Sequence, residues 1–344
     1  MQLYNKLSKK ERLDLINKAG EKRLTLSFYK YSKIKNTFIF RNFLFVHLDK
    51  LNVLGRVYIA SEGINAQVSV PASKLIEFKN SIDSILFLNG VRLNIAIEHN
   101  DEAFLKLKIK IKEKIVADGL NLNDYDLDVH GKHVNAEEFN ELLEDKNTIT
   151  IDMRNHYESE VGHFKGAYLP DVDTFRESLP LIKNKYKSYK KNRKILMYCT
   201  GGIRCEKASA YLLKNGFKNV YQLNGGIVEY ARQVKENKIE NKFVGKNFVF
   251  DNRLGERISN DIISNCHQCG KKCDEHTNCN NEACHLLFIQ CENCKKKYHG
   301  CCSKKCNKIY SMPTEKQKEF RQGKKSSNKI FKKGRFKKTT INQV

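Results

Sequence analysis

The sequence of 344 residues has no run of about 18 consecutive apolar residues, which a helix needs to cross a membrane. Its first residues lead into a charged segment and not into the apolar stretch of an export signal. The sequence also has no glycine fingerprint for a flavin or nicotinamide dinucleotide. We therefore expect a cytoplasmic protein without a membrane segment and without a dinucleotide cofactor.

The cysteines are absent from most of the chain and crowded in two places. Of the twelve cysteines, Cys199 and Cys205 lie in one short loop, and the other ten fall between Cys266 and Cys306. In the reducing interior of a cell, thiols serve catalysis or metal binding more often than disulfides. The two clusters therefore predict one reactive site and one metal-binding module.

Acidic residues are scarce at both ends of the chain. Residues 304–344 hold 14 Lys and Arg but only two acidic residues, and residues 1–116 hold 21 against 11. The middle is nearly neutral, although the whole chain has a net charge of +24. Basic blocks attract polyanions over roughly 8–10 Å in physiological salt. The pattern favours a nucleic-acid partner, with solvated lysine faces as the alternative.

Residues 21–117 predict a ferredoxin- or acylphosphatase-like α+β domain. Strand and helix patterns follow each other in the order β-α-β-β-α-β, which is the split βαβ arrangement. The expected strands are 24–29, 56–60, 64–70, 91–97 and 105–111, and the expected helices are 37–51 and 71–86.

Residues 145–239 predict a second domain, of the α/β class. Short apolar strands alternate there with helices, which indicates a parallel sheet covered on both faces. In such sheets the functional residues lie at the carboxyl ends of the strands. We expect residues 245–306 to form a Cys-rich metal-binding module and residues 307–344 to form a basic, disordered tail.

Cys199 directly follows the apolar strand pattern 194–198, and a helix is expected to begin near Cys205. Backbone N–H groups in such a loop point inwards and bind anions. These donors and Arg204 should lower the pKa of Cys199 below the free value of about 8.5, so we predict that Cys199 carries the chemistry. The alternative is a buried structural cysteine. The residues of the predicted anion cradle are Thr200, Gly201, Gly202, Ile203 and Arg204.

Neighbouring residues are expected to support this loop. Cys205 could act as a resolving thiol, although a packing role at the helix start fits equally well. We expect Asp152 and Arg154 to order the strand end and the loop without taking part in the chemistry. We expect His163 to be a hydrogen-bonded structural histidine and not a general base. No pair of histidines with a carboxylate for non-haem iron is evident.

Two C-x-x-C pairs, about twenty residues apart, have the spacing of a zinc ribbon. A closed site of four thiolates predicts a structural zinc ion, with an iron–sulfur cluster as the alternative. The ligands would be Cys266, Cys269, Cys291 and Cys294. Further cysteines and histidines could build a second site, but the sequence does not fix their pairing. Our choice for the second site is Cys279, Cys284, Cys302 and Cys306.

Residues 152–158 (DMRNHYE) and 162–167 (GHFKGA) resemble the segment that precedes the catalytic loop in rhodaneses. Rhodaneses are sulfurtransferases whose loop cysteine carries a persulfide, and Cys199 matches that cysteine by position. A related fold family binds phosphate in a longer Cys-x5-Arg loop. Because Arg204 comes one residue sooner here, we do not expect phosphatase activity.

The order of the whole chain is similar to that of the rhodanese-type tRNA uridine hydroxylases. The matching segments are 58–65 (YIASEGIN), 199–206 (CTGGIRCE), 266–269 (CHQC) and 285–291 (HLLFIQC). The resemblance implies a tRNA-modifying oxidoreductase that forms 5-hydroxyuridine at the wobble position. It also implies molecular oxygen as co-substrate and a requirement for the loop cysteine. The residues by themselves do not indicate hydroxylation.

Two other functions fit the same residues. One is a sulfurtransferase that passes sulfur from Cys199 to tRNA or to a small thiol acceptor. The other is an RNA-binding protein with a vestigial loop. The sequence predicts no particular protein partner, and Tyr29 and Tyr31 are candidates either for RNA contact or for the core of the first domain.

Overall fold

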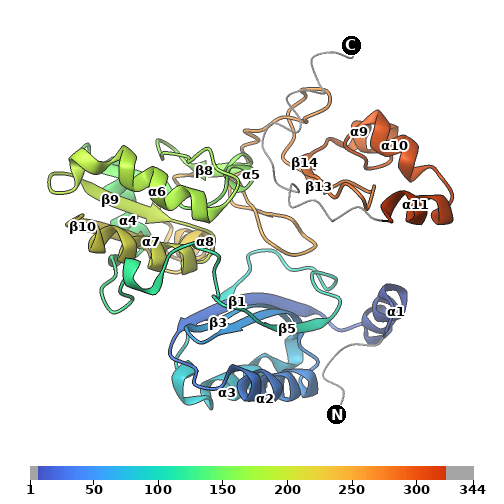
Figure 1. Cartoon of the computed structure of the whole chain (residues 1–344), viewed down its shortest axis with the longest axis horizontal. Coiled ribbons are helices and arrows are strands. Elements are labelled where there is room, and N and C mark those ends of the chain that lie inside the picture. The colour runs from blue at the N-terminus through green and yellow to red at the C-terminus, as the bar shows by residue number, and fades with distance from the viewer. Residues whose placement is uncertain (1–6, 323–344) are drawn as a thin grey trace.

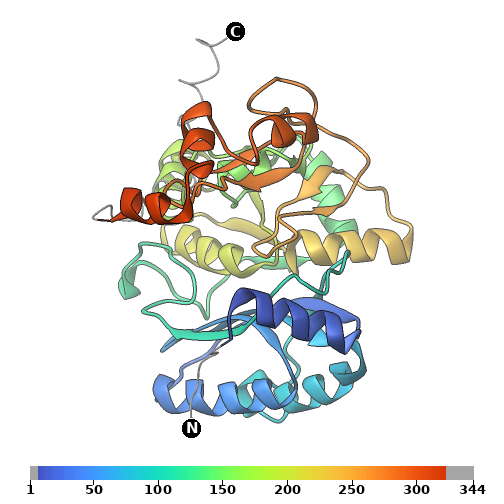
Figure 2. The same cartoon turned by 90° about the vertical axis from the view of Figure 1, so that its right-hand side faces the viewer.

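The computed structural model describes residues 7–322 (Figure 1). Figure 1 and Figure 2 show the N-terminal domain, in blue, at the bottom, and above it a second α/β domain and the Cys-rich module with its red helices, which lie side by side in Figure 1. None of the helices in the described residues is long and apolar enough to span a bilayer. The mixed α/β class predicted from the sequence is confirmed.

The N-terminal domain is a five-stranded sheet with two helices on one face. Its strand order is β4-β1-β3-β2-β5. The first four strands are antiparallel and have the predicted ferredoxin-like arrangement, whereas β5 adds parallel to β2 at the edge. The elements are α1 (Lys9–Ala19), β1 (Arg23–Tyr31), α2 (Thr37–Lys50), β2 (Leu54–Ala60), β3 (Gly63–Pro71), α3 (Leu75–Asp83), β4 (Asn94–Ile95) and β5 (Leu107–Ile111).

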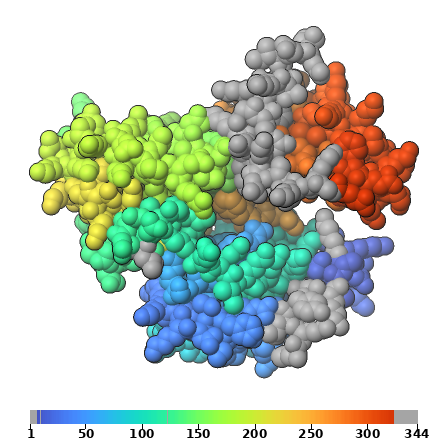
Figure 3. All heavy atoms as spheres, viewed as in Figure 1, coloured from blue at the N-terminus to red at the C-terminus, as the bar shows by residue number. Residues whose placement is uncertain are grey.

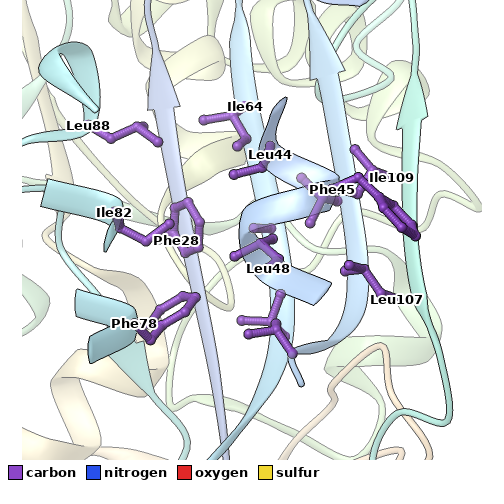
Figure 4. Packing of buried hydrophobic residues seen from close by; sticks show 14 of the residues in the cluster. Phe28, Leu44, Phe45, Leu48, Ile64, Phe78, Ile82, Leu88, Leu107 and Ile109 are labelled. Carbon is purple, nitrogen blue, oxygen red and sulfur yellow. The ribbon is translucent and has the colours of Figure 1, made fainter. Parts of the chain in front are cut away.

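The two faces of this sheet differ because side chains alternate along a strand. One face packs its apolar side chains against α2 and α3, as Figure 4 shows for Phe28, Leu44 and Phe78. The opposite face is polar and is turned towards the second domain (Figure 1). Its side chains include those of Thr25, Ser27, Tyr29, Arg56, Tyr58, Asn65 and Gln67.

The second domain is built on a parallel sheet with the order β6-β10-β9-β7. The sheet begins with β6, before residue 145, where the sequence analysis placed the start of this domain. The sequence analysis missed β6 because a strand of three residues is too short to show an alternating pattern. The elements are β6 (Lys132–Val134), α4 (Ala136–Glu144), β7 (Thr148–Asp152), α5 (His156–Ser159), β8 (Gly162–Phe164), α6 (Phe175–Lys185), β9 (Lys194–Tyr198), α7 (Ile203–Lys214), β10 (Asn219–Leu223) and α8 (Gly226–Asn237).

The Cys-rich module is joined to the second domain by strand pairing. Its first strand, β11, pairs antiparallel with β8, and β13 pairs with β14 in a small separate sheet. The elements are β11 (Phe243–Asn247), β12 (Glu256–Arg257), β13 (His276–Asn278), β14 (Leu287–Ile289), α9 (Glu292–Lys297), α10 (Lys304–Tyr310) and α11 (Thr314–Arg321).

The expectation of a disordered tail from residue 307 is wrong for residues 307–322. This stretch completes α10 and forms α11, which has Glu315 in its first turn and Lys318 and Arg321 in its last. That charge order suits the helix dipole, and Arg321 forms an ion pair with Glu282. The rest of the expected tail, 323–344, lies outside the described residues.

The first two domains are linked through a buried lysine of α7. The Nζ atom of Lys207 lies 2.6 Å from a carboxylate oxygen of Glu62, in the turn between β2 and β3, and 2.9 Å from one of Asp118. It also donates to the Tyr125 hydroxyl at 2.8 Å. In Figure 3 the teal segment that carries these last two residues fills the junction between the domains.

Replacing Lys207 by methionine should destabilise the protein strongly. The change leaves the carboxylate of Glu62 without its cation and leaves Asp118 with Lys114 as its remaining cation, and breaking a buried pair costs about 3–5 kcal/mol. Lys214→Met, at an exposed position of the same helix, should change the free energy of unfolding by less than about 0.5 kcal/mol. Urea unfolding followed by circular dichroism checks this. Equal midpoints for the two variants would contradict the role of Lys207.

Candidate active site

Cys199 lies at the carboxyl end of β9, where the chain turns into α7. Its thiol is fully buried, and Sγ accepts a hydrogen bond from the backbone N–H of Gly202 at 3.1 Å. Gly202 has a φ of 100°, and a Cβ there would come within 2.7 Å of the Tyr29 hydroxyl. Only glycine therefore allows this turn while Tyr29 packs against it. The helix begins at Ile203, two residues before the predicted start, so its free N–H groups lie near the sulfur.

The loop holds Cys199 as a thiolate. Burial by itself raises the pKa of Cys199, but other effects outweigh it and lower the pKa to about 6. These are a hydrogen bond with the Cys205 thiol, the charge of Arg204, and the backbone N–H groups of Arg204 and Cys205. Burial and the hydrogen bond to Cys199 raise the pKa of Cys205 well above its ordinary value. At neutral pH the proton between the two sulfurs therefore stays on Cys205.

Arg204 is fixed by a buried carboxylate that the sequence reasoning missed. Its guanidinium donates to the two oxygens of Glu158 at 2.6 and 2.9 Å, and to the Thr200 hydroxyl at 3.3 Å. Glu158 is fully buried, so this two-pronged pair holds the guanidinium beside the loop. Glu158 and Arg204 are 46 residues apart, so no local pattern in the sequence pairs them. The one signal that could have drawn attention to Glu158 was its place in the segment 152–158, which resembles rhodaneses.

The structure places Asp152 and Arg154 at the end of β7 and His163 on β8. Nε and Nη2 of Arg154 donate to the carboxylate of Asp152 at 2.7–3.1 Å, and Nη2 also donates to the carbonyl of Gly162 at 2.6 Å. Both side chains of this pair are fully buried. Nδ1 of His163 lies 2.9 Å from the carbonyl oxygen of Ser159. These contacts tie the end of β7 to β8.

A cavity of about 450 Å³ lies beside the loop, between the N-terminal sheet and the second domain. The loop borders it through Cys199 and Gly201, the polar sheet face borders it through Tyr58 and Gln67, and Phe250 lies at a third wall. Two domains and the segment that follows β11 thus enclose one space. Its aromatic, amide and guanidinium groups suit a flat, polar ring.

Tyr29 and Tyr31 of β1 lie against the loop. The Tyr29 hydroxyl donates to a carboxylate oxygen of Glu206 at 3.2 Å, and the Tyr31 hydroxyl donates to the carbonyl of Ile203 at 3.2 Å. Both side chains therefore connect the N-terminal sheet to the first turn of α7.

The structure brings two histidines and a carboxylate together, contrary to the sequence analysis. Donor atoms of His130, His133 and Glu206 lie within 4.8 Å of one another. The set was missed because Glu206 is 73 residues from His133. The Glu206 carboxylate already accepts hydrogen bonds from Tyr29 and from Gln222, and it lies 2.8 Å from Nε2 of His133. These partners account for its position without a metal ion.

The module contains two groups of four cysteines that could each hold a metal ion. Within each group the sulfur atoms lie within 4.8 Å of one another, for example 3.6 Å between Cys269 and Cys291 and 3.7 Å between Cys284 and Cys302. The groups are the two sets chosen from the sequence: Cys266, Cys269, Cys291 and Cys294, and Cys279, Cys284, Cys302 and Cys306. Among the described residues, Cys273 and Cys301 belong to neither group.

Three family models match consecutive parts of the chain. They describe a UPF0176 acylphosphatase-like domain at residues 23–115, a rhodanese-like domain at 135–233 and a rhodanase C-terminal domain at 244–307. A solved rhodanese-like domain protein from Staphylococcus aureus is 28% identical and covers 29% of this chain and 90% of its own, with a TM-score of 0.24. Because the rhodanese-like family model spans residues 135–233, the acidic Cys199 lies in a rhodanese-like domain.

Two curated relatives match nearly the whole chain. A tRNA uridine(34) hydroxylase from Leptospira interrogans is 51% identical over 97% of this chain and 90% of its own length. One from Photorhabdus laumondii is 49% identical over 97% of this chain and 95% of its own length. The chain belongs to the tRNA uridine(34) hydroxylase family.

Replacing Cys205 by alanine should make Cys199 less acidic. The change removes the thiol that hydrogen-bonds to Cys199, so the pKa of Cys199 should rise from about 6 towards its free value. Alkylation of Cys199 by iodoacetamide as a function of pH, followed by peptide mass spectrometry, measures this pKa. Cys273→Ala, a buried cysteine outside the loop, is the matched control and should leave it unchanged. The same midpoint in the Cys205→Ala protein would rule out the proton shared between the two sulfurs.

Proposed function

We propose that this protein hydroxylates uridine at the wobble position of tRNA to 5-hydroxyuridine, with molecular oxygen as co-substrate and Cys199 as the essential thiolate. Family membership supports the substrate and the reaction, because both relatives compared above are named tRNA uridine(34) hydroxylases. The observation that carries the assignment of Cys199 is its lowered pKa at the border of the cavity. Since tRNA is found in the cytoplasm, we place the protein there.

Cys205 is the resolving thiol in this proposal. Insertion of one atom of O2 into the C5–H bond of uridine, with the other atom reduced to water, consumes two electrons and two protons. Oxidation of the Cys199 thiolate and the Cys205 thiol to one disulfide supplies the two electrons and one proton, and solvent supplies the second proton. The sulfurs of Cys199 and Cys205 are already hydrogen-bonded to each other, and a thiol from solution would reduce the disulfide for the next turnover.

Wobble hydroxylation should require Cys199. In a strain that lacks this protein and any parallel pathway, the wild-type chain should restore 5-hydroxyuridine in tRNA, and Cys199→Ser should not. Nucleoside mass spectrometry of the tRNA checks this, and isotopically labelled dioxygen should appear in the product. Cys273→Ser, outside the loop, should behave as wild type. Full modification by the Cys199→Ser protein would refute the essential role of Cys199. Product oxygen that comes only from water would refute molecular oxygen as co-substrate.

Sulfur transfer is the second candidate, because the rhodanese-like match covers the Cys199 loop. In that case Cys199 would carry a persulfide and pass its outer sulfur to an acceptor. Thiosulfate:cyanide turnover at the rate of a dedicated sulfurtransferase, with unchanged 5-hydroxyuridine in the deletion strain, would favour this function over hydroxylation.

We assign a structural zinc ion to each four-cysteine group. Four soft sulfur donors within 4.8 Å of one another fit a closed tetrahedral site, which leaves no position for a substrate. The ions would hold the loops around β13 and β14 in place, because this part of the chain has little regular structure and a small core.

The purified protein should contain two zinc ions per chain. Cys266→Ser removes one ligand of the first group, so the zinc content should fall to about one ion and the module should become less stable. Cys273→Ser removes a neighbouring cysteine that belongs to neither group, and it should keep both ions. Elemental analysis measures the metal. Iron together with visible absorption of a cluster would contradict zinc, and full zinc content after Cys266→Ser would contradict the ligand assignment.

We place the tRNA backbone on a basic groove that continues from the cavity. A second cavity of about 690 Å³ is lined by Arg12, Arg56, Lys106 and Lys108, and it shares Arg56 and other residues with the cavity at Cys199. The charge of Lys110, slight burial and the charge of Lys106 lower the pKa of Lys108. Cations crowded in this way favour a polyanion, and phosphates would then pass along β5 towards Cys199.

Lys108→Gln should weaken tRNA binding and its salt dependence. Loss of one phosphate contact should reduce the slope of log affinity against log salt by about 1. Lys79→Gln, an exposed lysine of α3 on the opposite side of the sheet, should leave the slope unchanged. Filter binding or fluorescence anisotropy over a range of salt concentrations measures the slope. Equal slopes for the two variants would exclude this groove as the path of the backbone.

A further inference from the structure

Two residues that line the cavity at Cys199 each have a buried side-chain oxygen that makes no hydrogen bond within the described part of the chain. They are Thr25, through Oγ1, and Asn94, through Oδ1. Buried polar atoms in folded proteins almost always have a partner, so two exceptions around one space are informative. They indicate a ligand that brings its own hydrogen-bond donors into the cavity.

Asn94 is the one of the two that touches the loop of Cys199. It lies on β4, opposite Ser27 of β1, and its side chain is 5% exposed. Its Nδ2 atom donates to the backbone carbonyl of Gly201 at 3.3 Å. Because the amide nitrogen is engaged by the loop, the atom that remains for a ligand is an acceptor. A cavity residue with a buried acceptor selects for a ring that carries an N–H group.

Uracil has such a group at N3, between its two carbonyls. Cytosine has an unprotonated nitrogen at the same position, whose lone pair would face the oxygen of Asn94. Enzymes that act on a base usually extrude it from its neighbours, hydrogen-bond to this edge and stack the ring on aromatic side chains. Tyr29, Tyr58 and Phe250 line the same cavity and can provide that stacking.

We propose that Asn94 selects uracil over cytosine at the reacting position, by accepting a hydrogen bond from N3–H of the base at Oδ1. The proposal rests on the function proposed above and deepens it, since it names the residue that reads the base. In this proposal the two domains have different roles. The N-terminal sheet recognises the ring, and the loop of the rhodanese-like domain holds the sulfur.

Binding of anticodon stem–loops tests this without turnover, in full-length protein that carries Cys199→Ser. The RNAs differ only at the wobble position, which is uridine, cytidine or 3-deazauridine, in which C–H replaces N3–H. A protein with Asn94 intact should bind the uridine RNA about 10- to 100-fold more tightly than the other two. The double variant that carries Asn94→Ala as well as Cys199→Ser should prefer uridine by about 2-fold or less, because it no longer has the side-chain oxygen that accepts from N3–H.

Two further variants separate recognition from folding. Asn94→Asp keeps an acceptor oxygen and should keep the preference for uridine over 3-deazauridine. Asn89→Ala, an exposed asparagine in the segment before β4, should bind as the parent protein does. The comparison of uridine with 3-deazauridine in the parent protein needs no change at Asn94, so it tests the contact even when the alanine variant does not fold.

The outcomes for Asn94 and for the proposed function can be told apart. Equal affinity of the parent protein for uridine and 3-deazauridine RNA, or an unchanged preference in a folded Asn94→Ala protein, overturns the role of Asn94. Incubation of protein with Cys199 intact and the uridine RNA in air tests the function separately. If the protein hydroxylates the RNA but the Asn94 variants show no effect, only the present inference is overturned. If folded, zinc-loaded protein does not hydroxylate the RNA, the result counts against the proposed function.

Discussion

A negatively charged sulfur in a fully buried position is the constraint on which this structure depends. Burial opposes the thiolate of Cys199, and the chain compensates with hydrogen bonds from a neighbouring thiol and from backbone N–H groups at the start of α7. The nearby guanidinium of Arg204 is already paired with Glu158. The sulfur is therefore stabilised by dipoles, by the proton that it shares with Cys205 and by the charge of Arg204, although that guanidinium is also paired with Glu158. Such a thiolate stays available as a nucleophile.

The first turn of α7 connects this sulfur to the rest of the molecule. Arg204 reaches back to α5, Glu206 meets the hydroxyl of Tyr29 from the N-terminal sheet, and Lys207 is buried between Glu62 and Asp118. Because these side chains leave the helix in different directions, one helical turn fixes both the loop and the neighbouring domain. A shift of the N-terminal sheet would thus move the wall of the cavity and the loop together.

The sequence predicted those parts of the fold and of the site that local patterns control. Alternating apolar residues predicted β1, β2 and β3, and the spacing of C-x-x-C pairs predicted the first group of four cysteines. Contacts between distant residues were not accessible, which explains why the partner of Arg204 and the cluster around Glu206 were missed. The short strand β6 was missed for another reason, since three residues carry no readable period, and α11 was missed because its basic composition concealed the charge order of a helix.

In the proposed function, the polar face of the N-terminal sheet supplies the base recognition that the loop of the rhodanese-like domain lacks. A loop that holds a thiolate has no means of telling one pyrimidine from another, because the sulfur and the amide N–H groups surround a single atom. To distinguish uracil from cytosine, a protein needs hydrogen-bond donors and acceptors that reach the edge of the base while the sulfur lies at the reacting carbon. Strands β1, β2 and β3 present such side chains on one flat surface, since every second residue faces the cavity while the alternate residues are held in the core by α2 and α3. The same alternation places Lys108 and Lys110 on the outer face of β5, opposite the buried Leu107 and Ile109. In the proposed function, this sheet would bind the RNA backbone along its edge and read the base on its face, while the rhodanese-like domain supplies the thiolate.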